Sequence, residues 1–338
     1  MPTLSISVSP TDISSLYIDD KLNISSDVYP YPFVKATNPA WSLDSYLDFL
    51  IPVIFEELSK GKIEKGTRLL VSSFCDLPNL KTEVASYKLF SEIFNHIEEF
   101  SYFYEAGYLC SHNKNVYFGI MKSEFITDEI FDYCSNKAVY PNLIPKDKKL
   151  EIVSDFINSA AYNSLNYEVT KNNHIVFSGY RFSIFQNPLH RYIRMLDLIK
   201  NPGIYDIRLD ASNKLINLYH IKIFDSNLYE NVMDSNVFPK VGTLIKAKGP
   251  VECLVESNLN TSQLLEVKDD DLLVLPIEEH SEVRLVLKNT SIAAKEIFVR
   301  GGSLGLIIDT RRENTDINYY ASKLLAWETS VNSVMRDF

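Results

Sequence analysis

Glycine is scarce in this sequence. The 338 residues include 11 glycines, about 3% of the chain, where average usage is roughly 7%. Phosphate groups are mostly held by glycine-rich turns, because bare backbone N–H groups can approach the ligand closely there. The scarcity therefore argues against a chain built around several phosphate-binding loops, and against collagen-like or linker-rich classes. Gly301, Gly302 and Gly305 nevertheless fall close together.

Cysteines and long apolar runs are also few. The 4 cysteines are spread without any CxxC spacing, which disfavours a disulfide scaffold or a zinc ribbon and favours reduced thiols. Residues 1–15 have neither a basic region nor an unbroken apolar stretch, so we expect no signal peptide. The most apolar stretch, residues 47–55, is interrupted by Asp48 and Pro52 and is too short to cross a bilayer. We expect a cytoplasmic protein without membrane insertion.

Positive charge is in deficit. The 34 Lys and Arg residues face 44 Asp and Glu residues, and the formal net charge is −10. No segment gathers a basic stripe, so nucleic acid is not an expected partner. The histidines show no HxH or HxxxH spacing, and Cys110 and His112 are the only tight Cys/His pair. Because zinc needs three or four converging ligands, we predict no metal site.

Helix and strand patterns alternate along the first two thirds of the chain. Residues 4–8 and those around 16–18 alternate apolar and polar side chains on either side of a turn, which predicts two paired strands. Apolar residues recur at helical spacing over residues 44–60. The alternation that follows is typical of the α/β class. It comprises 68–74 (strand), 83–100 (helix), 101–124 (hairpin), 148–166 (helix), 174–179 (strand), 187–200 (helix) and 204–209 (strand).

The composition changes near residue 240. Short strand patterns separated by turn residues follow, as expected for a small antiparallel sandwich or barrel, and residues 316–334 have an amphipathic helical pattern. We therefore predict three parts, namely an α/β region over 1–235, a β domain over 240–312 and a C-terminal helix within 313–338. The predicted strands of the β domain are 241–247, 252–256, 264–267, 272–277, 283–287, 296–299 and 304–308.

The sequence supplies no catalytic candidate. Ser72 and Ser73 follow an apolar strand pattern but lack the GxSxG turn that exposes a nucleophilic serine. Pairs of acidic residues such as Asp269 and Asp271 lie at predicted turns, where solvated carboxylates are common. We assign no catalytic residue, and these observations disfavour an enzyme.

The strongest local signal is the segment from Val299 to Arg311. A double glycine before an apolar strand that ends in Asp309 and Arg311 could form an anion-binding nest. Alternatively, Gly301 and Gly302 make a tight turn while Asp309 and Arg311 pair with each other. Residue chemistry alone favours this second, structural interpretation.

The same segment resembles the ending of a known family. GGSLGLIIDTR, residues 301–311, is similar to the GG-(A/T)-LG-(L/V)-IID-(A/T)-R ending of the MutL/GlmL-type proteins. These methylaspartate mutase accessory proteins belong to the superfamily that joins actin, sugar kinases and heat-shock ATPases. The resemblance covers about residues 170–325, where weaker similarities follow in the same order as in the family. They lie at 174–179, 187–197, 202–210, 241–245 and 272–277.

The resemblance implies a reduced actin-like (ribonuclease H-like) α/β part, followed by the small antiparallel β domain and the C-terminal helix. It also implies that nucleotide-binding positions, if retained, are Asp12 in the first hairpin and Ser178 with Gly179 in the adenosine-side turn. The resemblance also implies a structural motif, which comprises Gly301, Gly302, Gly305, Asp309 and Arg311.

This sequence departs from the family at its phosphate-binding loops. The first hairpin turn has no glycine, and Pro10 contributes no N–H group. Tyr180 follows Gly179 where a small residue is usual, and Arg312 begins an Arg-Glu-Asn segment in place of Gly-Arg-Pro. We therefore expect a non-catalytic interaction or scaffold protein with a protein partner and no cofactor.

Two other functions stay open. The first is an ATP-dependent accessory chaperone that reactivates a cobalamin-dependent mutase, and only this function would require ATP and magnesium. The second is a structural subunit of a surface or pilus assembly machine.

Overall fold

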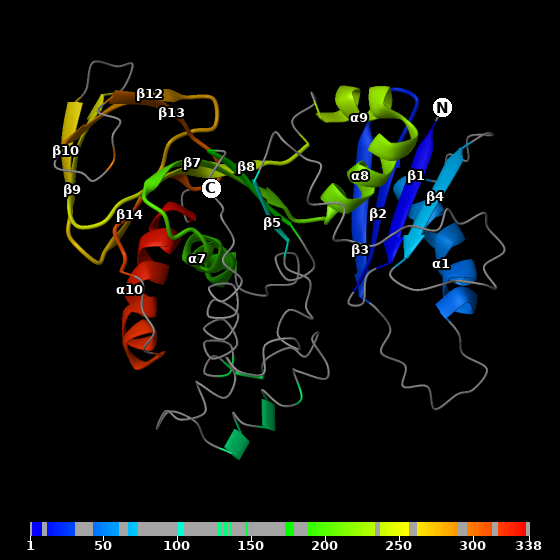
Figure 1. Cartoon of the computed structure of the whole chain (residues 1–338), viewed down its shortest axis with the longest axis horizontal. Helices are drawn as coiled ribbons and strands as arrows, with labels where there is room; N and C mark the ends of the chain where they lie inside the picture. Colours follow the sequence, from blue (N-terminus) through cyan, green and yellow to red (C-terminus); the bar gives the residue numbers. More distant parts are fainter. Residues whose placement is uncertain are drawn as a thin grey trace.

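The computed structural model shows a mixed α/β protein with three sheets. It describes residues 2–8, 12–30, 43–60, 67–73, 101–104, 173–178, 188–233, 237–256, 262–288, 292, 296–312 and 317–335, with a few positions between 128 and 150. Figure 1 shows the first sheet (blue), a central sheet beside it and a small sheet beyond. None of the described helices is long and apolar enough to cross a membrane.

The first sheet has four strands in the order β3-β2-β1-β4. Its first three strands pair antiparallel, and β4 runs parallel to β1. A parallel pair needs a crossover connection, and helix α1, with Pro52 inside it, lies between β3 and β4. The paired strands predicted within residues 4–18 and the helix predicted over 44–60 are confirmed. The elements are β1 (Thr3–Val8), β2 (Asp12–Ile18), β3 (Ile24–Pro30), α1 (Leu43–Leu58) and β4 (Arg68–Ser73).

Both faces of the first sheet are covered. On one face Leu4, Ile6 and Ile13 pack with α1 in one apolar cluster. The other face carries Ser5 and Ser14, which are also buried, and it packs against helix α8. The sequence patterns did not predict α8 (Lys214–Phe224) or the following helix α9 (Ser226–Met233).

The central sheet has six strands in the order β11-β14-β8-β7-β6-β5. Strands β5, β6 and β7 are parallel, β8 is antiparallel to β7, β14 is parallel to β8, and β11 is antiparallel to β14. Helices α7 and α10 share an apolar cluster with one face of this sheet (Figure 1). The elements are β5 (Ser101–Tyr104), β6 (His174–Ser178), α7 (Pro188–Leu198), β7 (Gly203–Asp210), β8 (Lys240–Lys246), β11 (Leu272–Leu275), β14 (Gly305–Asp309) and α10 (Ile317–Met335).

The small sheet is antiparallel, in the order β10-β9-β12-β13, and packs on the opposite face of the central sheet. Cys253 and Leu285 of the small sheet lie in one apolar cluster with Ile245, Leu306 and Ile308 of the central sheet. Helices, central sheet and small sheet thus form three layers. The strands are β9 (Val251–Glu256), β10 (Ser262–Val267), β12 (Glu282–Lys288) and β13 (Glu296–Arg300).

All seven strands predicted between 240 and 312 are present, but they do not form one antiparallel unit. Three of them, β8, β11 and β14, belong to the central sheet, and β8 pairs with β14 in parallel. The physical reason is that alternating apolar and polar side chains predict a strand but do not specify which strand it pairs with. The division into 1–235, 240–312 and 313–338 stays a prediction about folding units.

Some predicted elements lie largely or wholly outside the described residues. These are the helices over 83–100 and 148–166, and most of the hairpin over 101–124. The described part of that hairpin, β5, pairs in parallel with β6.

Candidate functional site

A buried polar network brings two of the predicted nucleotide positions together. Asp12 is the first residue of β2, Ser178 the last of β6 and Asp210 the last of β7. The Asn213 side-chain amide donates to Asp12 Oδ2 at 2.9 Å, and the Ser178 hydroxyl donates to Asp210 Oδ2 at 2.7 Å. Each of these four residues is at most 1% exposed. We call them the α8 cap network.

The network closes the N-terminus of helix α8. Asp210 Oδ1 accepts the backbone N–H of Lys214, and Asp210 Oδ2 accepts that of Leu215, both at 2.8 Å. A helix N-terminus favours negative charge, because its first N–H groups have no partner within the helix. Burial raises the pKa of Asp210, while the hydrogen bonds from Leu215, Lys214 and Ser178 act in the opposite direction. The carboxylate of Asp210 thus takes the place that an external anion would take.

A second set of polar contacts continues along the same face of the first sheet. The Ser5 hydroxyl donates to Asn217 Oδ1 at 3.0 Å, and the Asn217 amide donates to the Ser14 hydroxyl at 3.0 Å. All three side chains are buried. Buried polar groups need such partners, because an unsatisfied group costs about 1–3 kcal/mol. Ser5 and Ser14 of the sheet and Asn217 of α8 therefore satisfy each other.

Sequence reasoning missed Asp210, Asn213 and Asn217. A signal for the first two existed, since Asp210, Ser212 and Asn213 directly precede the apolar pattern of α8 and are residue types that begin helices. Gly179 and the turn at residues 9–11 lie outside the described residues.

The glycines of the 301–311 motif lie where the backbone is crowded. A Cβ atom at Gly301 would stand 1.9 Å from the carbonyl oxygen of Ile277, and one at Gly302 would stand 2.6 Å from that of Lys240. Gly305 has φ +75°, and a Cβ there would stand 2.3 Å from the carbonyl oxygen of Leu275. These glycines let neighbouring segments of backbone approach each other, and their neighbours are main-chain atoms of this chain.

Asp309 and Arg311 pair with each other, as the structural interpretation of the motif expects. Arg311 Nε lies 3.0 Å from Asp309 Oδ1 and Arg311 Nη2 lies 3.0 Å from Oδ2, while Lys246 Nζ lies 3.0 Å from Oδ2. Burial acts to raise the pKa of Asp309, but the two cations outweigh it and hold that pKa below its ordinary value. Burial lowers the pKa of Lys246, which Asp309 partly offsets.

Arg311 also connects the end of β14 to both helices on that side of the central sheet. Arg311 Nη1 lies 2.8 Å from Asp197 Oδ1 on α7, and the Tyr320 hydroxyl of α10 donates to Asp197 Oδ2 at 2.8 Å. The guanidinium carbon lies 4.8 Å from the ring centre of Trp327, a cation–π contact. A single arginine therefore joins α7, β14 and α10.

The described part of the chain holds neither a metal-binding cluster nor a reactive thiol. No group of three or more His, Cys, Asp or Glu residues is placed there to hold a metal ion. Cys253 is buried in the small sheet, and burial raises its pKa to about 11, so its reactive thiolate form is disfavoured.

Comparison with known proteins identifies no family for this chain. No protein-family model matches the sequence, and no curated protein matches it. The structure is similar to that of the activator of the 2-hydroxyisocaproyl-CoA dehydratase from Clostridium difficile with bound ADPNP, at a TM-score of 0.36 and 10% sequence identity. The match covers 70% of this chain and 97% of that chain. A likeness of this degree carries no conclusion about function.

Proposed function

We propose that this chain is a non-catalytic interaction or scaffold protein built on a degenerate actin-like core. The α8 cap network is the observation that carries this proposal. Asp12 and Ser178 are the positions at which the resemblance to MutL/GlmL-type proteins puts a nucleotide, and both side chains bind other side chains of the same chain.

Burial makes this arrangement unsuited to a nucleotide. A metal-bound triphosphate needs solvent-accessible carboxylate oxygens and free N–H groups at a helix N-terminus. The carboxylate of Asp12 is buried, and Asp210 already accepts the first N–H groups of α8. A phosphate group would have to displace the buried carboxylate of Asp210 from these N–H groups.

Calorimetric titration with ATP and magnesium tests the proposal, using the wild type and Asp12→Asn. We expect no saturable binding by the wild type, and we expect Asp12→Asn to lower the midpoint of urea unfolding. A micromolar Kd for ATP that is lost in Asp12→Asn would contradict the proposal. That outcome would instead support the ATP-dependent accessory chaperone.

A further inference from the structure

A pocket of about 390 Å³ opens at the carboxyl ends of two parallel strands of the central sheet. Residues 247–249 follow the end of β8, and residues 310–312 follow the end of β14. The crevice beyond the carboxyl ends of parallel strands is where open α/β sheets usually bind ligands. The volume falls within the roughly 300–1,000 Å³ range of small-molecule sites.

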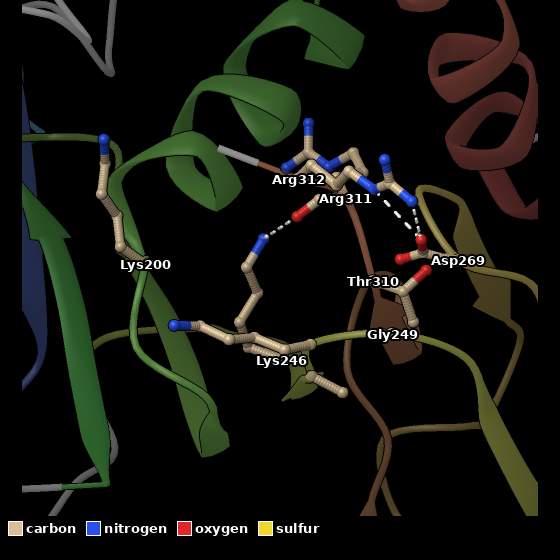
Figure 2. Close-up of a pocket in the computed structure, with 9 residues that line it drawn as sticks. Lys200, Lys246, Gly249, Asp269, Thr310, Arg311 and Arg312 are labelled. Atoms are coloured by element: carbon tan, nitrogen blue, oxygen red, sulfur yellow. Dashed lines mark hydrogen bonds and ion pairs between the residues drawn. The ribbon is translucent and has the colours of Figure 1, made fainter. Parts of the chain in front are cut away.

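The lining of this pocket is strongly basic. Its charged residues are five cations and one carboxylate, namely Lys200, Lys246, Lys248, Arg311, Arg312 and Asp269. Figure 2 shows Lys200 across the pocket from Asp269, with Lys246 pointing toward the main-chain oxygen of Arg311. Lys246 and Arg311 are balanced by the buried carboxylates of Asp309 and Asp197 behind the lining. The other three lining cations outnumber the single lining carboxylate, and this positive balance favours an anion.

Buried ion pairs fix the side chains at the base of the pocket. The side chains of Lys246 and Arg311 are 9% and 3% exposed and are held in place by Asp309. Gly249 beside them has φ +80°, and a Cβ atom there would meet no atom within 4 Å, so the turn after β8 leaves open space over the pocket. The rim is adjustable, because Lys248 and Arg312 are exposed.

We propose that this basic pocket binds the phosphate group of a small phosphorylated molecule. A phosphate group at neutral pH carries about 1.5 to 2 negative charges and three acceptor oxygens, which matches several lining cations better than a single carboxylate does. The site is separate from the α8 cap network and does not depend on the proposed function.

Asp269 gives the proposal a distinctive consequence. At the rim its carboxylate forms an ion pair with Arg312, and among the described residues that line the pocket it is the one acidic side chain. A bound phosphate must compete with Asp269 for Arg312. Removing this carboxylate should therefore tighten phosphate binding, whereas removing a cation should weaken it.

The test is calorimetric titration of the full chain with inorganic pyrophosphate and with inorganic phosphate. We expect saturable binding of pyrophosphate that weakens about tenfold in Lys248→Ala and in Arg312→Ala, since each loses a charge-assisted hydrogen bond. We expect Asp269→Asn to bind several-fold more tightly, and Lys288→Ala, which removes an exposed lysine of the small sheet, to bind like the wild type. These changes lie at exposed positions, and circular dichroism checks that each variant is folded.

Three results would overturn the proposal. They are the absence of saturable binding at millimolar pyrophosphate, equal affinities in all variants, and tighter binding of the dicarboxylate malonate than of pyrophosphate. Asp12→Asn separates this site from the nucleotide positions. Binding through the basic pocket persists in Asp12→Asn and weakens in Arg312→Ala, whereas binding at the nucleotide positions shows the reverse.

Discussion

At the scale of residues, the charges buried at the end of β14 are paired with one another. Asp309 lies between Arg311 and Lys246, and Arg311 continues to Asp197. A buried pair of this kind adds little net stability over an apolar alternative, but breaking it leaves a charge in the interior. The residues at the end of β14 are therefore sensitive to any change that removes one partner.

Asp309→Asn keeps the shape of the side chain and removes its charge. We expect the free energy of unfolding to fall by about 3 kcal/mol or more, because Lys246 and Arg311 lose a buried counter-charge. Urea unfolding followed by circular dichroism measures the change. The control is Asp269→Asn, whose partner Arg312 is exposed, and its midpoint should match that of the wild type. Equal midpoints for the two variants would refute this assignment.

Gly305 and Gly249 form a matched pair for testing the role of the glycine motif. Both have positive φ, but only Gly305 is crowded by main-chain atoms. Gly249→Ala should cost about 1–2 kcal/mol, the strain of a left-handed backbone with a Cβ atom. Gly305→Ala should cost clearly more, because its Cβ also collides with the carbonyl of Leu275. Thermal unfolding of both variants measures the difference, and similar melting temperatures would show that the crowding is not limiting.

At the scale of elements, helix α8 buries the polar face of the first sheet. The alternation over residues 4–18 reads as a strand pair with one apolar and one polar face, and such a polar face usually meets water. Here α8 covers it, and Asn217 bonds to both Ser5 and Ser14. Val176 of the central sheet shares an apolar cluster with Leu16 of the first sheet and Leu215 of α8, so the helix also joins the two sheets.

The packing of α8 makes stability depend on pH through His220. Burial lowers the pKa of His220 from 6.5 to about 4. Below pH 6.5 the unfolded chain therefore binds a proton on His220, whereas the folded chain does not. The contribution of His220 to the free energy of unfolding is present above pH 6.5 and is lost as the pH falls toward 4. The loss is on the order of 3 kcal/mol across this window.

Urea midpoints at several pH values between 7 and 4 check this dependence in the wild type and in His220→Gln, which cannot titrate. The wild type should lose stability more steeply than the variant. Parallel curves for the two proteins would mean that other groups cause the pH dependence.

At the scale of the whole molecule, segments far apart in the sequence share one sheet. Strand β8 lies between β7 and β14, so residues 203–210 and 305–309 depend on the same neighbour. The small sheet then covers the face opposite α7 and α10. The C-terminal third is thus part of the central sheet and also supplies the additional layer.

A fragment that ends at residue 235 tests whether the predicted boundary separates folding units. It lacks β8, β11 and β14, which are half of the central sheet. We expect it to be unfolded or aggregated, because it exposes an open strand edge at β7 and the apolar side chains that pack against α10. Limited proteolysis and circular dichroism, with the full chain as control, measure this. A protease-resistant, cooperatively unfolding fragment would instead establish residues 1–235 as an autonomous domain.

The sequence by itself determined the positions of most described strands and helices and indicated the pairing of Asp309 with Arg311. These features depend on local periodicity, turn chemistry and neighbours a few residues apart. Only the tertiary structure decided that β8 and β14 lie in parallel within the central sheet, that α8 covers the serine face, and that Asp12 meets Asn213. These features depend on contacts between residues up to 212 positions apart, and side-chain patterns along a chain do not specify which distant segments will meet.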